Sequence, residues 1–171
     1  MAAIPEETIS DSWRDANEAT RELSEILVRR AISYVQSQLP HLADALGLAA
    51  CGPATRLTYS HGEPAINVYT GAGGAFFPHQ DMQALTLLLP LSDAGEEFDG
   101  GGTAFWPPGA SLPAAKKGTQ PPVAVLRPPA GTALLWSGTL VHAGAELTRG
   151  RRLVFVASFT PVEGATALRV Q

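Results

Sequence analysis

The chain has 171 residues, 45% of them hydrophobic, which fits a single globular domain with one sizeable core. Twelve Lys and Arg residues against sixteen Asp and Glu residues give a formal net charge of −4. No overall positive field would therefore recruit nucleic acid or an anionic membrane, and we expect neither as a partner. Cys51 is the single cysteine, which excludes an intramolecular disulfide and any multi-cysteine zinc or iron–sulfur site.

The N-terminus and the apolar runs bear on where the protein resides. The opening residues MAAIPEETISDSW lack the positive region and the apolar stretch of a secretory signal. The longest apolar run, residues 84–91, is broken by Pro90 and falls far short of the ~20 residues of a membrane-spanning helix. We therefore expect a soluble, intracellular and cytoplasmic protein with no membrane segment.

The first third of the chain carries apolar residues at helical spacing. Steps of three and four residues predict one apolar face on a helix that runs from about Asn17 to Leu39 and ends at Pro40. The residues of that face are Leu23, Ile26, Leu27, Ala31, Tyr34 and Val35. A shorter helical pattern follows at residues 41–50. We assign residues 1–53 to an N-terminal helical segment that belongs to the same domain as the rest of the chain.

Residue 54 begins a segment of β character. Short apolar runs bounded by turn residues predict strands at residues 55–60, 65–70, 84–92, 103–106, 123–128, 132–137 and 153–160. Gly and Pro concentrate between these runs, which is typical of the tight connections in an antiparallel sandwich or barrel. Only residues 107–122 look loop-like over their whole length. The predicted fold is therefore mainly β, with residues 54–171 as the core and the N-terminal helices packed on one sheet.

Three side chains could meet around one metal ion. His79 and Asp81 are two positions apart, so on an extended chain they project from the same face. His142 ends the run TALLWSGTLVH, a strand and turn that a sandwich could fold back beside the first pair. Two histidines and one carboxylate form the facial ligand set that suits non-haem Fe(II) and leaves three coordination positions open. A His-x-Asp pair alone is a weak signal, so its neighbours matter.

Two further polar residues accompany this set. Arg152 lies ten residues after His142, at the start of the apolar run LVFVASFT, where its guanidinium could hold a dicarboxylate by a bidentate pair. Tyr69 lies ten residues before His79 and could give the same anion a hydrogen bond. Arg151 stays an alternative, because a one-residue shift of the strand would turn it inward in place of Arg152.

These residues belong to an ordered set of motifs that resembles the iron- and 2-oxoglutarate-dependent dioxygenase superfamily, in its prolyl 4-hydroxylase-like branch. The motifs run from Tyr69 to Phe159 and cover about half of the chain. They are Tyr-x3-Gly-Gly-x-Phe-Phe-x-His-x-Asp, LTLLLPLS, GGGTAFW, RPPAGTALLW, and His-x-Gly followed by Leu-Thr-x-Gly-x-Arg. With arginine at position 152, the chain resembles the arginine-bearing side of the superfamily more closely, since the collagen-type prolyl hydroxylases use lysine there.

The resemblance implies a double-stranded β-helix, or jelly roll, in which His79, Asp81 and His142 are the ligands of Fe(II) and the catalytic residues. The cosubstrate 2-oxoglutarate would lie bidentate on the iron, with Arg152 pairing its far carboxylate and Tyr69 assisting. The implied reaction converts 2-oxoglutarate to succinate and carbon dioxide while a C–H bond of the substrate is hydroxylated. The retained Asp81 favours hydroxylation over the halogenation of related enzymes. Ascorbate dependence is common in this superfamily, and only the resemblance implies it here.

The substrate is less defined than the chemistry. The resemblance favours peptidyl proline or another protein side chain first, and it leaves free amino acids and small metabolites open. Residues 93–102 and 107–122 are expected to flank the entrance and select the substrate. Two other classes stay open: a cupin-like metalloenzyme that uses the same three ligands without an oxo-acid, and a non-catalytic jelly-roll binding module. The sequence leaves the oligomeric state open.

Overall fold

The computed structural model describes residues 18–162 of the chain. The helices are α1 (Glu18–Gln38), α2 (Pro40–Ala45) and α3 (Leu112–Lys116). The strands are β1 (Leu57–Tyr59), β2 (Ala65–Thr70), β3 (Phe76–His79), β4 (Leu85–Pro90), β5 (Phe98–Gly100), β6 (Thr103–Phe105), β7 (Ala124–Leu126), β8 (Leu134–Trp136), β9 (His142–Gly144) and β10 (Leu147–Pro161). Within this range, no helix is both long and apolar enough to cross a bilayer. Asn17, the predicted start of the first helix, and residues 1–13, predicted not to be a secretory signal, lie outside the described residues.

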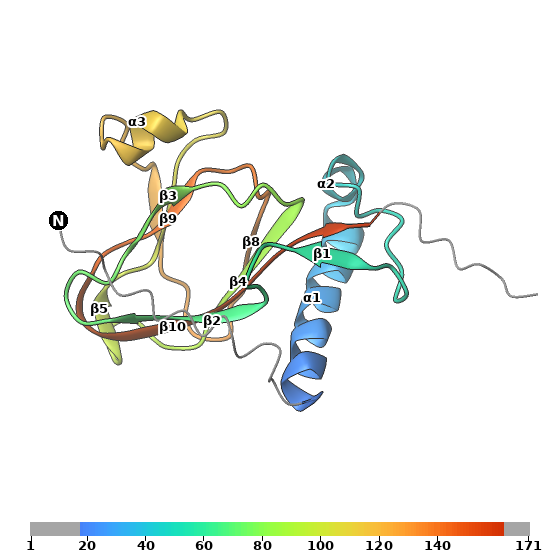
Figure 1. The fold of residues 1–171 in the computed structure, drawn as a ribbon, viewed down its shortest axis with the longest axis horizontal. Helices are drawn as coiled ribbons and strands as arrows, with labels where there is room; N and C mark the ends of the chain where they lie inside the picture. Colours follow the sequence, from blue (N-terminus) through green and yellow to red (C-terminus); the bar gives the residue numbers. More distant parts are fainter. Residues whose placement is uncertain (1–17, 163–171) are drawn as a thin grey trace, which may run out of the picture.

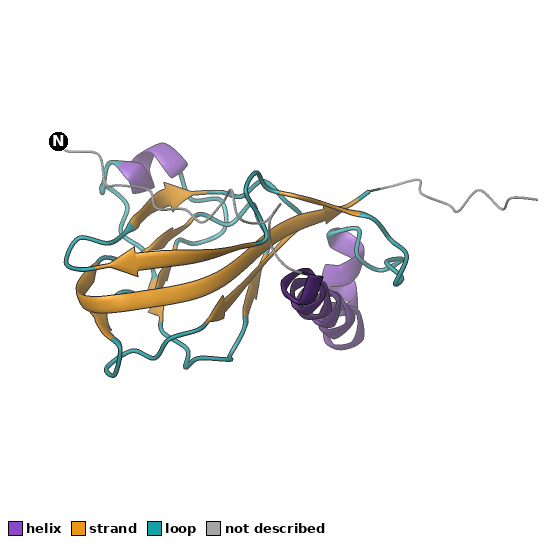
Figure 2. Ribbon diagram, turned by 60° about the horizontal axis from the view of Figure 1, so that its bottom comes forward, coloured by secondary structure: helices purple, strands orange, loops and turns teal. Residues whose placement is uncertain are grey.

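The strands form two antiparallel sheets. In the six-stranded sheet, β10 pairs with β1 and β2 along one side and with β4 along the other, β4 pairs with β8, and β5 pairs with the start of β10. The four-stranded sheet has the order β3-β9-β6-β7. Figure 1 shows the strands arranged around the middle of the molecule, and Figure 2 shows them in layers with α1 and α2 at one end. The arrangement confirms the predicted mainly β fold and agrees with a jelly roll.

The two faces of the six-stranded sheet carry different side chains, because successive residues of a strand point to opposite sides. Phe155, Ala157 and Phe159 of β10 and Leu85 and Leu87 of β4 share one buried core with the helices. The α1 residues in this core are Val28, Ala31, Ile32 and Val35. The helices therefore cover one face of this sheet, as the sequence predicted. The intervening residues of β4 and β10 face the second sheet and line the interior in which the candidate site lies.

The buried face of α1 differs from the predicted one. Leu23, Ile26 and Tyr34 were predicted to share one apolar face with Leu27, Ala31 and Val35, but they are 61%, 43% and 56% exposed. The buried residues of the helix are Ser24, Val28, Ala31, Ile32 and Val35. The prediction was wrong for these three residues because apolar side chains extend around much of the helix, and because the polar Ser24 belongs to the row that is buried.

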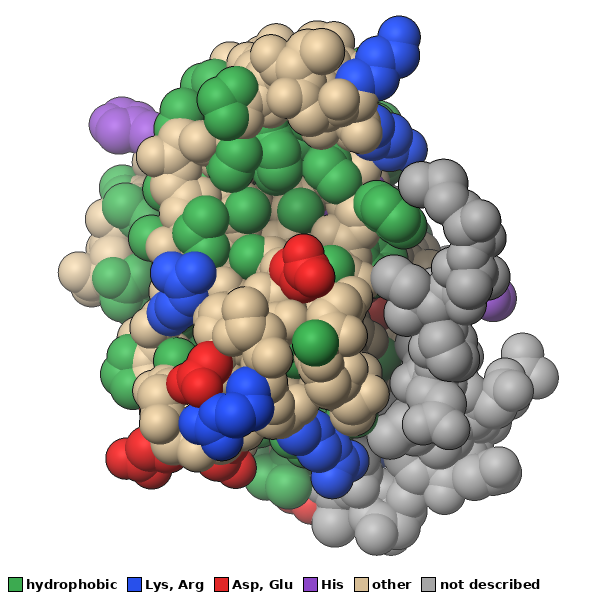
Figure 3. All heavy atoms as spheres, turned by 90° about the vertical axis from the view of Figure 1, so that its left-hand side faces the viewer, with side chains coloured by type: hydrophobic (Ala, Val, Ile, Leu, Met, Phe, Trp, Pro, Cys, Tyr) green, Lys and Arg blue, Asp and Glu red, His purple; other side chains and the backbone are tan. Residues whose placement is uncertain are grey.

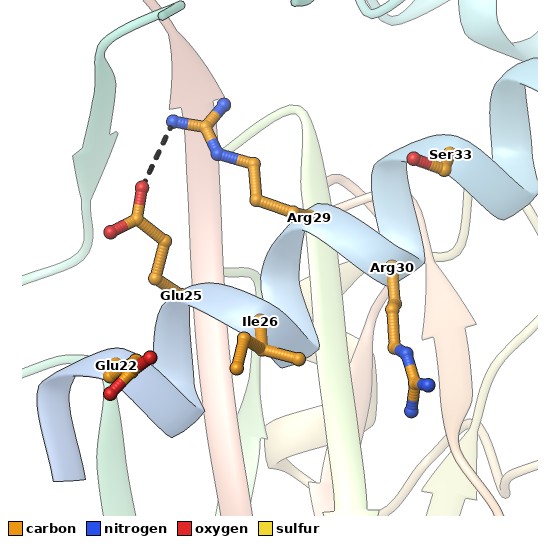
Figure 4. A pocket seen from close by; sticks show the side chains of 6 residues that line it. All are labelled: Glu22, Glu25, Ile26, Arg29, Arg30 and Ser33. Carbon is orange, nitrogen blue, oxygen red and sulfur yellow. Dashed lines mark hydrogen bonds and ion pairs between the residues drawn. The ribbon is translucent and has the colours of Figure 1, made fainter. Parts of the chain in front are cut away.

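The exposed side of α1 carries a shallow hollow of about 460 Å³. Its lining residues are Glu22, Glu25, Ile26, Arg29, Arg30 and Ser33. Figure 4 shows Arg29 reaching toward Glu25, and the Nη2–Oε1 distance is 3.5 Å. Arg29 also donates to the carbonyl oxygens of Gly52 and Thr55, at 3.1 and 2.8 Å, and so ties α1 to the segment that leads into β1. All six lining residues belong to one helix, so this hollow is separate from the interior between the sheets.

One helix and three strands were not among the predicted elements. Residues 107–122, predicted to be a loop throughout, contain α3, and Ser111 caps it by accepting a hydrogen bond from the Ala114 amide at 3.4 Å. β3, β5 and β9 are only three or four residues long and contain His, Asp or Gly, so no apolar alternation marks them. β10 begins at Leu147, well before residue 153, because its first residues pair with β5 and β2.

Figure 3 shows the face that lies on the left in Figure 1, where β3, β9 and β5 are found. Hydrophobic side chains gather over its upper and middle part, and basic and acidic side chains lie beside one another in its lower part. A nucleic-acid backbone is bound through clustered positive charge. The described residues of this face mix the two signs of charge instead of presenting a continuous basic surface.

Candidate metal centre

Three predicted ligands lie together between the two sheets. His79 at the end of β3 pairs across the ladder with His142 at the start of β9, so the two imidazoles are neighbours, with ring centroids 4.2 Å apart. The segment after β3 turns Asp81 toward them, because the amides of Asp81 and Met82 both donate to the Gly138 carbonyl at 2.9 and 3.0 Å. Met82 has a φ of 60°, in the left-handed region that such a tight turn needs. One donor atom from each of the three residues lies within 4.8 Å of the others.

The backbone fixes which imidazole nitrogen faces the centre. His79 Nδ1 lies 2.8 Å from the Phe77 carbonyl oxygen, and His142 Nδ1 lies 2.9 Å from the Leu140 carbonyl oxygen. A carbonyl oxygen only accepts, so each Nδ1 donates its proton there and each Nε2 is the nitrogen that faces Asp81. The Nε2 atoms lie 3.3 Å from Asp81 Oδ1 and 3.5 Å from Asp81 Oδ2. Two imidazole nitrogens and a carboxylate that converge in this way can bind one metal ion once both Nε2 atoms are unprotonated, so the donor set fits a metal.

The charges of two of these groups suit a metal ligand. Burial alone would raise the pKa of Asp81, but the neighbouring His79, His142 and Thr86 together hold it below its ordinary value. Burial lowers the pKa of His142, although the charge of Asp81 opposes the shift. At neutral pH, Asp81 is therefore ionised and His142 is neutral. These are the protonation states that metal coordination needs.

Aromatic side chains form the walls beside the two histidines. The Phe76 ring meets the His79 ring edge-on at 4.6 Å, and the Trp136 ring meets the His142 ring at 4.8 Å. Phe105 packs on Trp136 at 5.2 Å. Trp136 is 6% exposed, and its indole Nε1 has no hydrogen-bond partner among the described residues. Trp136 thus shields the His142 side of the ligands from water, which strengthens interactions between charges there, whereas Phe76, on the His79 side, is 40% exposed.

A buried cation lies at the other end of the same interior. Arg152 is 4% exposed, its Nη2 donates to Thr103 Oγ1 at 3.1 Å, and its Cζ lies 5.3 Å from the centre of the Tyr69 ring. Burial lowers the pKa of Arg152, and the nearby Arg127 acts in the same direction. Among the described residues, no acidic side chain forms an ion pair with Arg152. A buried guanidinium without a counter-ion is unfavourable, so the interior offers a site for an anion.

The register of the second sheet relates the two ends of the interior. Phe105 of β6 pairs with His142 of β9, and Thr103 pairs with Gly144. Two residues of an antiparallel strand span about 7 Å, so Thr103 and the bound guanidinium lie roughly that far along the sheet from the histidines. Any Cβ at Gly144 would lie 3.1 Å from Tyr69 Cε1, so the glycine lets the phenol ring approach β9. The separation suits a short dicarboxylate with one end at the metal ligands and the other at the guanidinium.

The placement of the remaining predicted residues is clear-cut. Arg152 points into the interior and Arg151 is exposed, so the register places the first and not the second on the inner face. Tyr69 pairs directly with Arg152 across β2 and β10. The pKa of Tyr69 is raised by burial, which keeps the phenol protonated and able to donate. Thr103 was missed as a site residue, although the motif GGGTAFW contains it, because the sequence does not show that β6 lies opposite Arg152.

No protein-family model matches the chain, and no curated protein matches it. Among the solved structures that share a remote likeness with the chain are the following three. EvdMO1 has a TM-score of 0.47 at 19% identity and covers 68% of this chain and 30% of its own. AviO1 from Streptomyces viridochromogenes Tue57 has a TM-score of 0.47 at 19% identity, with 70% and 54% covered.

The third structure is an oxidoreductase of the 2OG-Fe(II) oxygenase family from Burkholderia pseudomallei, with a TM-score of 0.46, 17% identity, and 77% of this chain and 57% of that chain covered. The chain spans less than two thirds of the length of each of these proteins. At this level of similarity, the function has to be inferred from the residues of the site.

Proposed function

We propose that the chain is an Fe(II)- and 2-oxoglutarate-dependent dioxygenase that hydroxylates an organic substrate. The observation that carries this proposal is the buried Arg152, which has no acidic partner among the described residues and lies in the same interior as the cluster of His79, Asp81 and His142. A facial set of two histidines and one carboxylate suits non-haem iron. A separate buried cation is not needed to hold that metal, but it is needed to hold a second acid group.

Each residue of the interior has a part in this proposal. Nε2 of His79, Nε2 of His142 and the Asp81 carboxylate would hold the iron. With 2-oxoglutarate and dioxygen, iron bound there supplies the oxidation of an unactivated C–H bond, with succinate and carbon dioxide released. Arg152 would bind the far carboxylate of the cosubstrate by charge-assisted hydrogen bonds, and the Tyr69 hydroxyl would donate to it. The Thr103 hydroxyl, which accepts from Arg152 Nη2, would orient the guanidinium.

The finer features of the proposal concern the branch and the substrate. Asp81 keeps the third ligand position filled by protein, which favours hydroxylation over halogenation. The resemblance to the prolyl 4-hydroxylase-like branch makes peptidyl proline, or another protein side chain, the first substrate to test, with ascorbate in the assay. The strongly exposed apolar side chains of Phe77 and Met82, at 75% and 73%, lie two residues before His79 and directly after Asp81. They support a substrate with an apolar portion near the ligands.

Two rival functions make different predictions about 2-oxoglutarate. A cupin-like metalloenzyme would use the three ligands for a reaction that needs no oxo-acid. A non-catalytic binding module would form no succinate with any substrate. Binding of 2-oxoglutarate that depends on Arg152, followed by succinate formation on exposure to air, separates the proposal from both.

The experiment compares Arg152→Ala with Arg151→Ala, which removes the exposed neighbour of the same type. Each protein is loaded anaerobically with Fe(II) and titrated with 2-oxoglutarate, and the metal-to-ligand charge-transfer band is recorded in the visible region. We expect the band in the wild type and in R151A, and a severe loss of 2-oxoglutarate affinity in R152A with metal affinity kept. Equal titrations of the two variants, or absence of the band in the wild type, would refute the proposal.

A further inference from the structure

One wall of the interior carries a row of buried polar residues that the proposed function does not use. Thr86 of β4 and Ser158 of β10 form a cross-strand pair, and both are 0% exposed. Beyond Ser158, in the segment before β2, lies the carboxyl group of Glu63. The row ends at Asp81, one of the proposed iron ligands. Buried polar groups are retained only where they are hydrogen-bonded, so their contacts show what they do.

The contacts form a continuous chain to the Asp81 carboxylate. Thr86 Oγ1 lies 2.5 Å from Asp81 Oδ2 and 3.3 Å from Ser158 Oγ. The Ser158 amide donates to Glu63 Oε2, and the Ser158 hydroxyl also contacts the Glu63 carboxyl group.

A gap in the ladder explains why Glu63 is needed there. β1 pairs with β10 at residues 159–161 and β2 pairs with it at residues 151–156, so the amide of Ser158 has no strand partner on that side. The Glu63 side chain fills the gap and satisfies this amide, as buried backbone groups require.

The number of protons available decides which group donates in each hydrogen bond of this row. The Thr86 hydroxyl has one proton, and the short contact to a carboxylate, which can only accept, places it on Asp81 Oδ2. Ser158 must then donate its own hydroxyl proton to Thr86 Oγ1. The Ser158 hydroxyl has no second proton for Glu63, so a complete chain requires Glu63 to be the donor. A neutral Glu63 carboxyl satisfies every group in the row, whereas an ionised Glu63 draws the Ser158 proton away from Thr86.

The surroundings of Glu63 favour the neutral form. Burial raises the pKa of Glu63 to about 7, against the hydrogen bonds from Ser158, which lower it. The charged groups that face it are Asp81, which raises the pKa, and His79, which lowers it.

We propose that Glu63, Ser158 and Thr86 are positioning residues that hold the Asp81 carboxylate in its ligating orientation, with the Glu63 carboxyl group as the donor at the far end. The inference rests on the proposed function for the identity of the metal site. Residues that orient a metal ligand from behind typically change metal affinity by about 10- to 100-fold when they are lost. The alternative is that Glu63 only satisfies the Ser158 amide, which predicts no effect on the metal.

The test measures the dissociation constant of Mn²⁺ by calorimetry at pH 6.5, without 2-oxoglutarate, in five proteins. Thr86→Val removes the donor to Asp81 at nearly constant volume, and Thr86→Ser keeps it. Glu63→Gln supplies both an acceptor for the Ser158 amide and a donor for its hydroxyl, whereas Glu63→Ala supplies neither. Circular dichroism and thermal melting of the metal-free proteins establish that each variant is folded. The visible spectrum of bound Co²⁺ gives a second readout of the ligand geometry.

We expect T86V and E63A to bind Mn²⁺ about tenfold more weakly or worse, with an altered Co²⁺ spectrum, and T86S and E63Q to stay within about threefold of the wild type. Equal Mn²⁺ affinity of E63Q and E63A overturns the role of Glu63 as a donor. Wild-type Mn²⁺ affinity in T86V overturns the proposal that the hydrogen-bonded row holds Asp81. If T86V does not fold, the comparison of E63Q with E63A decides. Failure of the wild type itself to bind Mn²⁺ refutes the proposed function, which is a separate outcome.

Discussion

Glu63 gives this fold a pH dependence that one substitution should remove. In the unfolded chain its carboxyl group titrates at the ordinary value of 4.5, and in the folded chain burial raises the pKa to about 7. The folded state therefore holds this proton more tightly, and stability is lost as the pH rises from about 4.5 to 7. The difference of 7 − 4.5 = 2.5 pKa units corresponds to about 3 kcal/mol at 1.36 kcal/mol per unit.

Glu63→Gln keeps both hydrogen-bonding functions of the neutral carboxyl group but cannot ionise. We expect E63Q and the wild type to have similar free energies of unfolding at pH 5, and E63Q to be more stable by up to about 3 kcal/mol at pH 8. Urea unfolding in the presence of a chelator measures both, and the groups shared by the two proteins cancel in the difference. If the free energies of unfolding of E63Q and the wild type differ by the same amount at pH 5 and pH 8, the raised pKa of Glu63 in the folded state is refuted.

Three further outcomes follow from packing and from ligand linkage. Gly144→Ala brings a methyl group to within 3.1 Å of Tyr69 Cε1 and Phe76 Cβ, so titration should show several-fold weaker 2-oxoglutarate binding with Mn²⁺ affinity kept within about twofold. Phe159→Ala empties a fully buried position under α1, and urea unfolding should show a loss of about 3–5 kcal/mol. Mn²⁺ at 100 times its dissociation constant should stabilise the wild type by about 2.7 kcal/mol, and Asp81→Ala should abolish that gain, as measured by chemical unfolding. An equal gain in D81A would contradict the proposed ligand set.

The sequence allowed the central strands and the His79–Asp81 pair to be predicted from short-range patterns, whereas His142 was joined to them only through a strand expected to fold back and through the order of the motifs. The apolar runs that became β2 and β4 stand out between turn residues, and β2 has the predicted bounds, residues 65–70. The spacing of two was the signal that paired His79 with Asp81, although in the structure a turn after β3, and not an extended strand, brings Asp81 to His79. By contrast, β9 is a three-residue strand that starts at His142, and only its pairing with β3 and β6 makes it a strand. Pairing between distant segments is absent from any local pattern.

The polar residues behind the ligands were missed for the same reason. Thr86 sits in an apolar run, and a single hydroxyl there looks like an ordinary strand residue. Its importance depends on facing the interior, opposite Leu85 and Leu87, which face the helices. Alternation along the strand does predict that Thr86 and its neighbours point to different sides. Which side carries the metal ligands is fixed only when α1 covers the other one.

The two faces of β4 and β10 also divide stability from binding. The outer face of β4 and β10 packs against α1 with fully buried apolar side chains, which stabilises the domain without involving the ligands. The inner face gathers the carboxylate and the two imidazoles of the candidate ligands at one end, and at the other a guanidinium that has no acidic partner among the described residues. Each end suits a ligand of opposite charge, a metal cation at the first and a carboxylate at the second. Stability and binding are therefore carried by opposite sides of the same strands, and substitutions under α1 should lower stability without changing the affinity for Mn²⁺.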